Sequence, residues 1–313
     1  MIETSGLRKS FRARKGTVDA VRGVDLKVRE GEIFGFLGPN GAGKTTTLRM
    51  LATLIVPDGG EATIAGVDLR RDPGEVRRRI GYVAQGLSTW DTVTAREELV
   101  LQARLYGIAK SRARELAARA IGSFQLTEFA DRKCQTYSGG QRRRVDVALG
   151  IIHEPKVVFL DEPTTGLDPQ SRAHMWDEVR RLRGEGMTVF ITTHYLEEAD
   201  ALCDRVAIMD HGEIVTEGTP DDLKREVAGD VVTVGVNGAA PRAAQLLGDQ
   251  PYVRQLETTE DGLRLYVDTG ATAIPHILRT LDGAGVGLAS IELHRPSLDD
   301  VFLTKTGRSL REE

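Results

Sequence analysis

The segment Gly38 to Thr46 reads GPNGAGKTT and follows directly on the apolar run Ile33 to Leu37. The GxxxxGKT pattern predicts a strand that turns through glycines into a helix, because glycine has no Cβ atom to keep backbone N–H groups away from a phosphate. The helix N-terminus adds a partial positive charge. We expect Lys44 to neutralise the β- and γ-phosphates of a nucleoside triphosphate, and the Thr45 hydroxyl to bind Mg²⁺.

A second helix start rich in glycine occurs where the chain reads Tyr137, Ser138, Gly139, Gly140 and Gln141. Its small residues again leave N–H groups open to an anion. One nucleotide bound to one phosphate loop does not need two such sites. The second site therefore requires an explanation outside a single copy of the chain.

Two adjacent carboxylates, Asp161 and Glu162, end the short apolar run Val157 to Leu160. Such a run is typical of a strand buried on both faces of a parallel sheet, and ligands bind at the carboxyl ends of these strands. Asp161 can reach the Mg²⁺ shell and Glu162 can address a water molecule; without a cation the two carboxylates would repel each other. A further apolar, β-branched run, Met187 to Thr193, ends at His194.

Residues 1–218 resemble the nucleotide-binding subunit of an ABC transporter, and the resemblance rests on seven elements in order. They are Phe11, the phosphate loop, Gln85, the signature SGGQ, the Asp161–Glu162 strand end, Asp168 and His194. The resemblance implies an α/β fold, a P-loop NTPase cassette with a RecA-like core, an antiparallel β subdomain and a helical signature subdomain at about residues 88–137. It also implies a homodimeric ATPase in which each ATP lies between one copy's phosphate loop and the other copy's signature.

The resemblance assigns a role to each matching position. Glu162 would be the general base or would position the attacking water, His194 would hold the γ-phosphate and the water, and Gln85 would touch Mg²⁺ and the water and sense a membrane partner. Phe11 would stack on adenine, or else it packs as a partly buried aromatic. Ser138 and Gly140 would close on the opposite copy's γ-phosphate and Asp168 would line the dimer seam. The expected ATP-binding set is Phe11, Gly38, Pro39, Asn40, Gly41, Ala42, Gly43, Lys44, Thr45, Thr46, Ser138, Gly139, Gly140, Gln141 and Asp168, and the expected Mg²⁺ set is Thr45, Gln85 and Asp161.

Composition restricts where such an ATPase works. The chain has 313 residues and a net charge of −4, and its pI is about 6.0, so nothing indicates a nucleic-acid-binding surface. Cys134 and Cys203 have neither metal-ligand nor CxxC spacing, which favours a reducing cytosolic setting. No stretch approaches the roughly 20 apolar residues that span a bilayer. We therefore expect a peripheral protein at the cytoplasmic face of the membrane, with a separate integral membrane permease subunit.

The segment between Gln85 and Tyr137 is predicted to be helical. Thr94 and Glu97 fit a capping box, and an apolar stripe follows it at Leu99, Leu101, Leu105 and Tyr106. In the family this region receives a short helix of the membrane partner, which makes Trp90 a contact candidate, with plain packing as the alternative. For Arg142 to Arg144 we favour a solvated helix face over phosphate binding.

Composition changes after residue 218, and we expect a linker at 219–229 and a small α+β accessory domain at 230–313. The predicted order of strands and helices, β-α-β-β-α-β, is that of a ferredoxin-like sandwich. A hairpin turn is expected at Glu260 to Gly262. A terminal helix is expected at Ser297 to Thr304.

The tail from Arg295 to Arg308, with its sequence RPSLDDVF and TGR, resembles ATP-binding subunits of the daunorubicin-resistance type, as does Tyr137 before SGGQ with three arginines after it. This implies export of a drug-like or amphipathic compound; an exporter of lipid or polysaccharide is the nearest alternative. Soluble ABC ATPases that act on nucleic acid or the ribosome fit less well. The chain has no long heptad arms between the phosphate loop and Asp161, and it has only one cassette.

Overall fold

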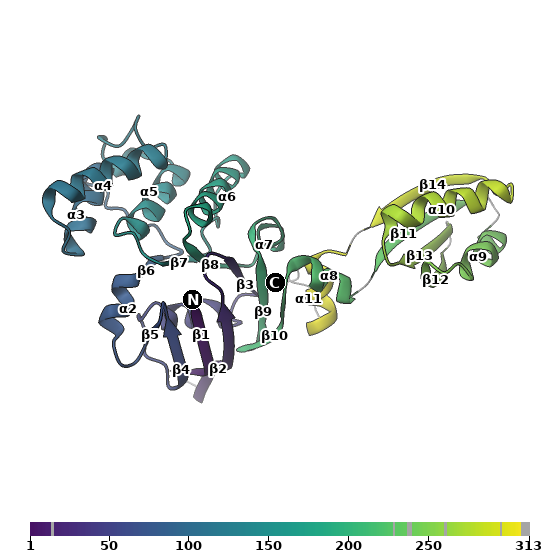
Figure 1. The fold of residues 1–313 in the computed structure, drawn as a ribbon, viewed down its shortest axis with the longest axis horizontal. Helices are drawn as coiled ribbons and strands as arrows, with labels where there is room; N and C mark the ends of the chain where they lie inside the picture. Colours follow the sequence, from purple (N-terminus) through teal and green to yellow (C-terminus); the bar gives the residue numbers. More distant parts are fainter. Residues whose placement is uncertain (14–15, 228, 237–239, 260–261, 295, 308–313) are drawn as a thin grey trace. The chain divides into compact units, whose positions relative to one another are not determined.

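The structure is a computed structural model that describes residues 1–13, 16–227, 229–236, 240–259, 262–294 and 296–307. The chain divides into two compact units, Met1–Thr219 and a second unit that begins at Pro220. Each unit has its own hydrophobic core, and each is described by itself below (Figure 1). Within these residues, no helix is long and apolar enough to cross a membrane.

A six-stranded sheet in the order β10-β9-β3-β8-β7-β6 forms the centre of the first unit. All its neighbouring pairs are parallel except β10 with β9. Each residue of β3, β7 and β8 is buried, as their apolar runs predict for strands covered on both faces. The strands are β3 (Ile33–Leu37), β6 (Ile80–Val83), β7 (Val157–Asp161), β8 (Thr188–Thr193), β9 (Arg205–Asp210) and β10 (Glu213–Gly218).

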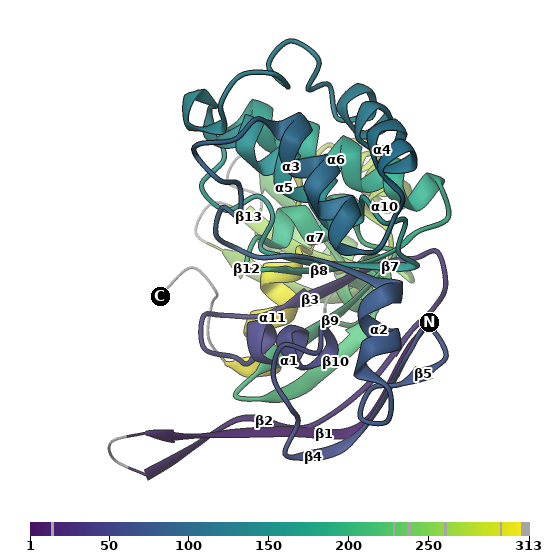
Figure 2. The same ribbon diagram turned by 90° about the vertical axis from the view of Figure 1, so that its left-hand side faces the viewer.

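A second, antiparallel sheet has the order β2-β1-β4-β5. Helix α1 (Lys44–Leu51) lies between the two sheets and contacts β2 on one side and β7 and β8 on the other (Figure 2). One hydrophobic core therefore joins both sheets. Within the six-stranded sheet, Phe34 of β3 stacks against Phe190 of β8 at a ring-centroid distance of 5.6 Å. The strands of this sheet are β1 (Ile2–Ala13), β2 (Gly16–Val28), β4 (Gly59–Ile64) and β5 (Val67–Asp68).

The remaining helices of the first unit are α2 (Pro73–Arg79), α3 (Ala95–Leu105), α4 (Lys110–Ser123), α5 (Gly139–Ile151), α6 (Pro169–Gly184) and α7 (Leu196–Leu202), with a short 3₁₀ turn at Cys134–Thr136. Helices α3 to α6 lie across the six-stranded sheet from α1, at the top of Figure 2. The predicted capping box is confirmed, because Thr94 and Glu97 bond reciprocally at the start of α3.

The predicted apolar stripe on α3 is wrong beyond Leu99. Leu99 is buried, but Leu101, Leu105 and Tyr106 are exposed to 42%, 73% and 39%. The buried face of α3 instead consists of Ala95, Glu98, Leu99 and Ala103, which recur at helical spacing. Because this face contains alanines and a glutamate, a count of large apolar residues does not reveal its helical spacing.

The second unit contains a four-stranded antiparallel sheet in the order β12-β13-β11-β14. Helices α9 and α10 supply Leu247, Ile277 and Leu281 to the core that this sheet shares. Its elements follow the order that the sequence predicts: β11 (Asp230–Val236), α9 (Ala240–Gly248), β12 (Val253–Thr259), β13 (Gly262–Val267), α10 (Gly270–Gly283) and β14 (Leu288–His294). Of the predicted hairpin turn, Glu260 and Asp261 lie outside the described residues.

Two more helices belong to this unit, α8 (Pro220–Val227) and α11 (Leu298–Thr306), and they contact each other. The terminal helix is therefore present as predicted and runs two residues further. Ser297 caps it in a capping box with Asp300, and Leu298, Val301 and Phe302 are buried. The tail residues Arg295 and Arg308 lie outside the described residues.

Candidate nucleotide-binding and hydrolysis site

The phosphate loop connects β3 to α1, and its glycines are required by backbone geometry. Gly38 has φ +152°, and a Cβ atom there would lie 2.1 Å from the Met209 carbonyl oxygen. Gly43, the N-cap of α1, has φ +109°, and its Cβ would lie 2.3 Å from the Ala20 carbonyl oxygen. No side chain caps α1 in the described structure. The N–H groups at such a helix start are suited to an anionic ligand.

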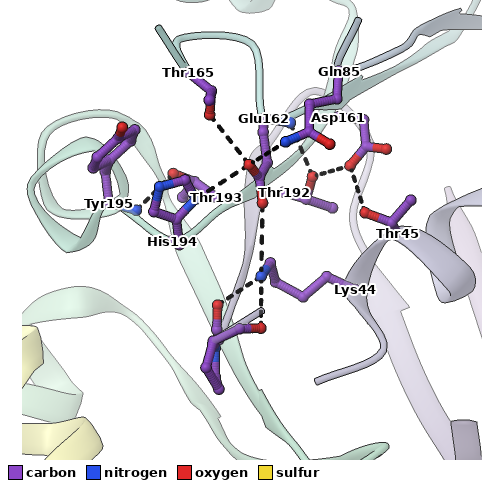
Figure 3. Close-up of polar contacts among 12 residues, drawn as sticks. Lys44, Thr45, Gln85, Asp161, Glu162, Thr165, Thr192, Thr193, His194 and Tyr195 are labelled. Carbon is purple, nitrogen blue, oxygen red and sulfur yellow. Dashed lines mark hydrogen bonds and ion pairs between the residues drawn. The ribbon is translucent and has the colours of Figure 1, made fainter. Parts of the chain in front are cut away.

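Lys44 is the first residue of α1 and is only 4% exposed. Its ammonium group donates to the carbonyl oxygens of Gly38 at 2.6 Å and Pro39 at 3.0 Å. It also lies 3.8 Å from Glu162 Oε1. The lysine thus bends back over the loop that begins at Gly38, and its charge faces the acidic end of β7 (Figure 3).

Two of the three residues predicted for Mg²⁺, Thr45 and Asp161, are hydrogen-bonded to each other, and the third, Gln85, bonds to the adjacent Glu162. Thr45 Oγ1 donates to Asp161 Oδ1 at 3.1 Å, and Thr192 Oγ1, from β8, donates to the same oxygen at 2.7 Å. Asp161 is 1% exposed. A half-buried hydroxyl and a buried carboxylate beside a phosphate loop fit the preference of Mg²⁺ for oxygen ligands, with phosphates and water completing the shell.

Glu162 lies at the centre of the polar cluster (Figure 3) and is 6% exposed. Its Oε2 accepts hydrogen bonds from Gln85 Nε2 at 2.9 Å and Thr165 Oγ1 at 3.2 Å. His194 Nδ1 lies 3.2 Å from the same oxygen, at ion-pair distance. The backbone of Glu162 is in the left-handed region, with φ +44°. This conformation is uncommon outside glycine and is often found at functional sites.

The charge state of Glu162 follows from its neighbours. Burial opposes ionisation, but the adjacent His194, the Lys44 ammonium group and the Thr165 hydroxyl together outweigh it and lower the pKa of the carboxyl below its usual value. Glu162 is therefore an ionised acceptor at neutral pH, which is the state that a water-positioning group or general base requires.

The signature residues form the start of α5. Ser138 is the N-cap and makes a capping box with Gln141, whose N–H donates to Ser138 Oγ at 3.2 Å while the Ser138 N–H donates to Gln141 Oε1 at 2.9 Å. A Cβ atom on Gly140 would lie 2.5 Å from Ser171 Oγ. The side chains of Ser138 and Gln141 bond to each other's backbone N–H groups. No bond described for them reaches the phosphate loop.

Asp168 and Phe11 lie apart from the polar cluster. Asp168 caps α6, where it accepts from the Ser171 N–H at 2.9 Å and from Ser171 Oγ at 2.7 Å. These bonds lower the pKa of its carboxyl. Phe11, on β1, is 42% exposed, with the Lys9 ammonium nitrogen 5.6 Å from its ring centroid. Phe11 is therefore partly exposed, and Lys9 lies over its ring.

The prediction of a solvated face for Arg142 to Arg144 is wrong. Arg143 is 3% exposed and donates to the carbonyl oxygens of Ala84, Asp161 and Pro163. Arg142 pairs with Asp91 at 2.6 Å, and Arg144 is half-buried with its guanidinium over the Phe129 ring. The helical period offered a signal that sequence reasoning missed, since Val147 and Gly150, four and seven residues after Arg143, are buried residues of the same helix face.

Trp90 does not have a packing role, because its side chain is 59% exposed. Leu87, in the same segment, is exposed to 53%. The backbone N–H of Trp90 donates to the Glu98 carboxylate at 3.2 Å. The segment is thus held by its backbone and presents its apolar side chains outward.

The chain resembles known proteins in sequence and in fold. Residues 21–165 match the ABC transporter family. A solved structure described as the dimeric post-hydrolysis state of the ATP-binding cassette MJ0796, bound to ADP and Pi, is 27% identical and has a TM-score of 0.64; the match covers 70% of this chain and 98% of that one. The chain therefore belongs to the family of ABC transporter ATP-binding proteins, and it is an ATPase. The predicted P-loop cassette with a small α+β second domain is confirmed.

The second unit narrows the assignment. Residues 218–306 match the family described as the C-terminal domain of DrrA1-3-like ATP-binding proteins. The daunorubicin resistance ATP-binding protein DrrA2 of Streptomyces coeruleorubidus is 45% identical over 96% of this chain and 94% of its own length. The daunorubicin/doxorubicin resistance ATP-binding protein DrrA of Streptomyces peucetius is 44% identical over 98% of this chain and 92% of its own length. Within the family, the chain is of the daunorubicin/doxorubicin-resistance type.

Proposed function

We propose that two copies of this chain bind ATP and Mg²⁺ head to tail and use hydrolysis to drive export of a drug-like or amphipathic compound through a separate membrane subunit. The names of the resistance proteins support the type of cargo. The dimeric ATP-binding cassette supports the pairing of two copies. Association with the cytoplasmic face of the membrane follows from the membrane subunit, which carries the path for the cargo.

The observation that carries this proposal is the convergence of Lys44, Thr45, Gln85, Asp161, Glu162 and His194 at the carboxyl ends of β3, β6, β7 and β8 (Figure 3). Thr45 and Asp161 would hold Mg²⁺, with Gln85 near its water shell. The ion, when bound, supplies positive charge to the β- and γ-phosphates. Lys44 and the N–H groups at the start of α1 add their own positive charge to the same phosphates.

Glu162 would orient the attacking water and accept its proton, since it is ionised and buried in the centre of the cluster. Gln85 and His194 contact Glu162 from two different strand ends and fix the direction of its carboxylate. Phosphoryl transfer to water depends mainly on alignment and on charge stabilisation. A cluster of pre-oriented side chains can supply both.

The remaining predicted residues would act between two copies. Phe11 would stack on adenine, whereas Ser138, Gly139 and Gly140 would bind the γ-phosphate of the ATP held by the partner copy. Asp168 would line the seam from its position at the start of α6. This arrangement explains why one chain has two helix N-termini suited to phosphate.

The test is Glu162→Gln in the full chain. The amide keeps the shape of the side chain but cannot accept a proton, so ATP should bind and hold a closed dimer while phosphate release falls about 100-fold or more. Sedimentation of the isolated chain measures the dimer, and phosphate release is measured with the membrane subunit present. The matched control is Glu213→Gln at an exposed glutamate of β10, which should behave as wild type. Full turnover by Glu162→Gln, or a monomer at saturating ATP, would contradict the proposal.

A further inference from the structure

Arg143 connects backbone carbonyls from two segments that are far apart in the sequence. Its Nη1 donates to the Ala84 oxygen at 2.5 Å, its Nε to the Pro163 oxygen at 2.8 Å and its Nη2 to the Asp161 oxygen at 3.2 Å. Only a guanidinium group presents several N–H donors in one rigid plane, so a lysine could not make these bonds together. The side chain is 3% exposed.

These carbonyls flank the two residues that contact each other in the site. Ala84 immediately precedes Gln85, and Asp161 and Pro163 stand on either side of Glu162. The hydrogen bond between Gln85 and Glu162 is 2.9 Å long. A single side chain, that of Arg143, therefore holds the backbone beside both of its partners. Glu162 holds a left-handed backbone conformation, and neighbouring contacts are needed to keep it there.

The same helix also holds the other end of the Gln85 segment. Asp146 Oδ1 accepts from the Ser88 N–H at 3.0 Å, and Arg142 Nη2 lies 2.6 Å from Asp91 Oδ1. Arg142, Arg143 and Asp146 all belong to α5, the helix that Ser138 caps. The orientation of α5 and the position of the segment from residue 84 to residue 91 are thus mechanically connected.

Burying this charge is unfavourable in isolation. Burial lowers the pKa of Arg143, while the carboxylates of Asp146, Asp161 and Glu198 oppose that shift. A buried charge that is fully bonded contributes little net stability compared with an apolar residue of equal size. Its presence beside the reacting groups is therefore better explained by geometry than by stability.

We propose that Arg143 is a positioning residue for ATP hydrolysis, which keeps Gln85 and Glu162 at bonding distance and couples that distance to the signature helix α5. The inference rests on the proposed roles of Gln85 and Glu162. It differs from them because the side-chain hydrogen bonds described for Arg143 go to backbone carbonyls, so that its proposed effect passes through Gln85 and Glu162.

The first experiment is Arg143→Met in the full chain, which keeps an unbranched side chain but removes the donors. Misplacement of Glu162 and Gln85 should lower kcat about 10- to 100-fold, while KM and the dissociation constant for ATP stay within about twofold because the phosphate loop is untouched. The matched control is Arg144→Met on the same helix, which should keep the wild-type kcat. A wild-type kcat for Arg143→Met, or a loss confined to ATP affinity, would overturn the inference.

A mutant cycle with Gln85→Ala separates positioning from general damage. If Arg143 acts through Gln85, Arg143→Met should lower kcat much less in the Gln85→Ala chain than in wild type. Losses that simply multiply would show that the two residues act independently, and would also overturn the inference.

Arg143→Lys keeps the inference testable if the methionine variant does not fold. Lysine retains the charge opposite Asp146 but reaches fewer carbonyls, so kcat should fall partly with KM unchanged. A wild-type kcat would count against positioning.

The Glu162→Gln test distinguishes failure of the role of Arg143 from failure of the proposed function. Stalled hydrolysis in Glu162→Gln together with normal turnover in the Arg143 variants refutes the role of Arg143 alone. Full turnover in Glu162→Gln refutes the assignment of the site itself.

Discussion

At the scale of single residues, the site contains two adjacent acids that lie in different environments. Asp161 points toward Thr45 and Thr192, which are hydroxyl donors, whereas Glu162 faces an amide, an imidazole and the Lys44 ammonium group. The first environment suits a metal ligand and the second suits a proton acceptor. Neighbouring positions in the sequence are thus suited to the two different roles that we propose for them.

The role of Lys44 gives a prediction at this scale. Lys44→Ala removes a buried positive charge from the phosphate loop, so the dissociation constant for Mg-ATP should rise about 10- to 100-fold, as expected for the loss of charge-assisted bonds. Isothermal titration calorimetry of the full chain measures it. Lys156→Ala, at an exposed lysine, is the control and should bind ATP as wild type does. Unchanged affinity in Lys44→Ala would contradict the role.

Residues differ in how far the sequence can predict them. His194 was predictable because a buried strand ends directly before it. Arg143 was predicted wrongly, because a run of three arginines usually faces water and the helical period that places it with Val147 and Gly150 was missed. The carbonyls of residues 84, 161 and 163 that it binds are visible only in the structure. The Gln85–Glu162 bond was likewise invisible, since it arises from the pairing of β6 with β7.

At the scale of elements, α3 and α5 enclose a pair of buried acids behind the segment that carries Trp90. Glu98 on α3 is 8% exposed and Asp146 on α5 is 2% exposed. Burial raises the pKa of Glu98 to about 7, the Trp90 N–H opposes this, and the charge of Asp146 adds to it. Burial also raises the pKa of Asp146 to about 6, against the Ser88 N–H and the Arg143 charge. Cys134 lies on the same side, with its sulfur 4.0 Å from Glu98 Oε2.

These shifts predict a pH dependence of stability. A carboxyl whose pKa is higher in the folded protein stabilises it below the unfolded pKa, and this contribution is lost as pH rises through the folded pKa. For Glu98 the stabilisation should therefore be complete below pH 4.5 and lost as pH rises through about 7. Glu98→Gln removes the titration, so its unfolding free energy relative to wild type should increase between pH 5 and pH 8 by about 1–3 kcal/mol.

Urea unfolding of the two proteins at both pH values measures this change. Glu115→Gln, at an exposed glutamate on α4, is the control and should show the same difference from wild type at each pH. A Glu98→Gln difference that does not change with pH would show that Glu98 does not titrate in this range.

Elements with strong local signals were predicted well. The strands β3, β7 and β8 are mostly apolar and buried along their whole length because both faces are covered. The caps of α3 and α11 follow from short polar patterns. The buried face of α3 was not predicted, because Ala95, Glu98 and Ala103 do not form a large apolar stripe. Their burial is decided by the helices packed against them.

At the scale of the whole molecule, the nucleotide cluster lies entirely in the first unit, while the second unit matches a family specific to DrrA1-3-like proteins. ATP chemistry and subfamily identity are therefore encoded in different parts of the chain. The proposed roles of the cluster concern hydrolysis and do not identify a cargo. Under the proposed function, cargo is identified with the membrane subunit present.

This separation gives a prediction for the assembled transporter. Under the proposed function, the full chain, copurified with a membrane subunit and placed in lipid vesicles, should release phosphate faster when an amphipathic drug is added, because cargo would favour the closed dimer. The same complex with Glu162→Gln should show no stimulation. Stimulation by lipid-linked saccharides and by none of the amphipathic drugs would favour the alternative exporter.

The left-handed backbone of Glu162 also has a consequence for the protein's evolution in the laboratory. Asparagine and glycine adopt this conformation more readily than glutamate, so position 162 is one where thermal robustness and turnover favour different residues. Selection for heat resistance alone would enrich asparagine or glycine there. The selected variants would be heat-stable proteins that lack the proposed general base for ATP hydrolysis.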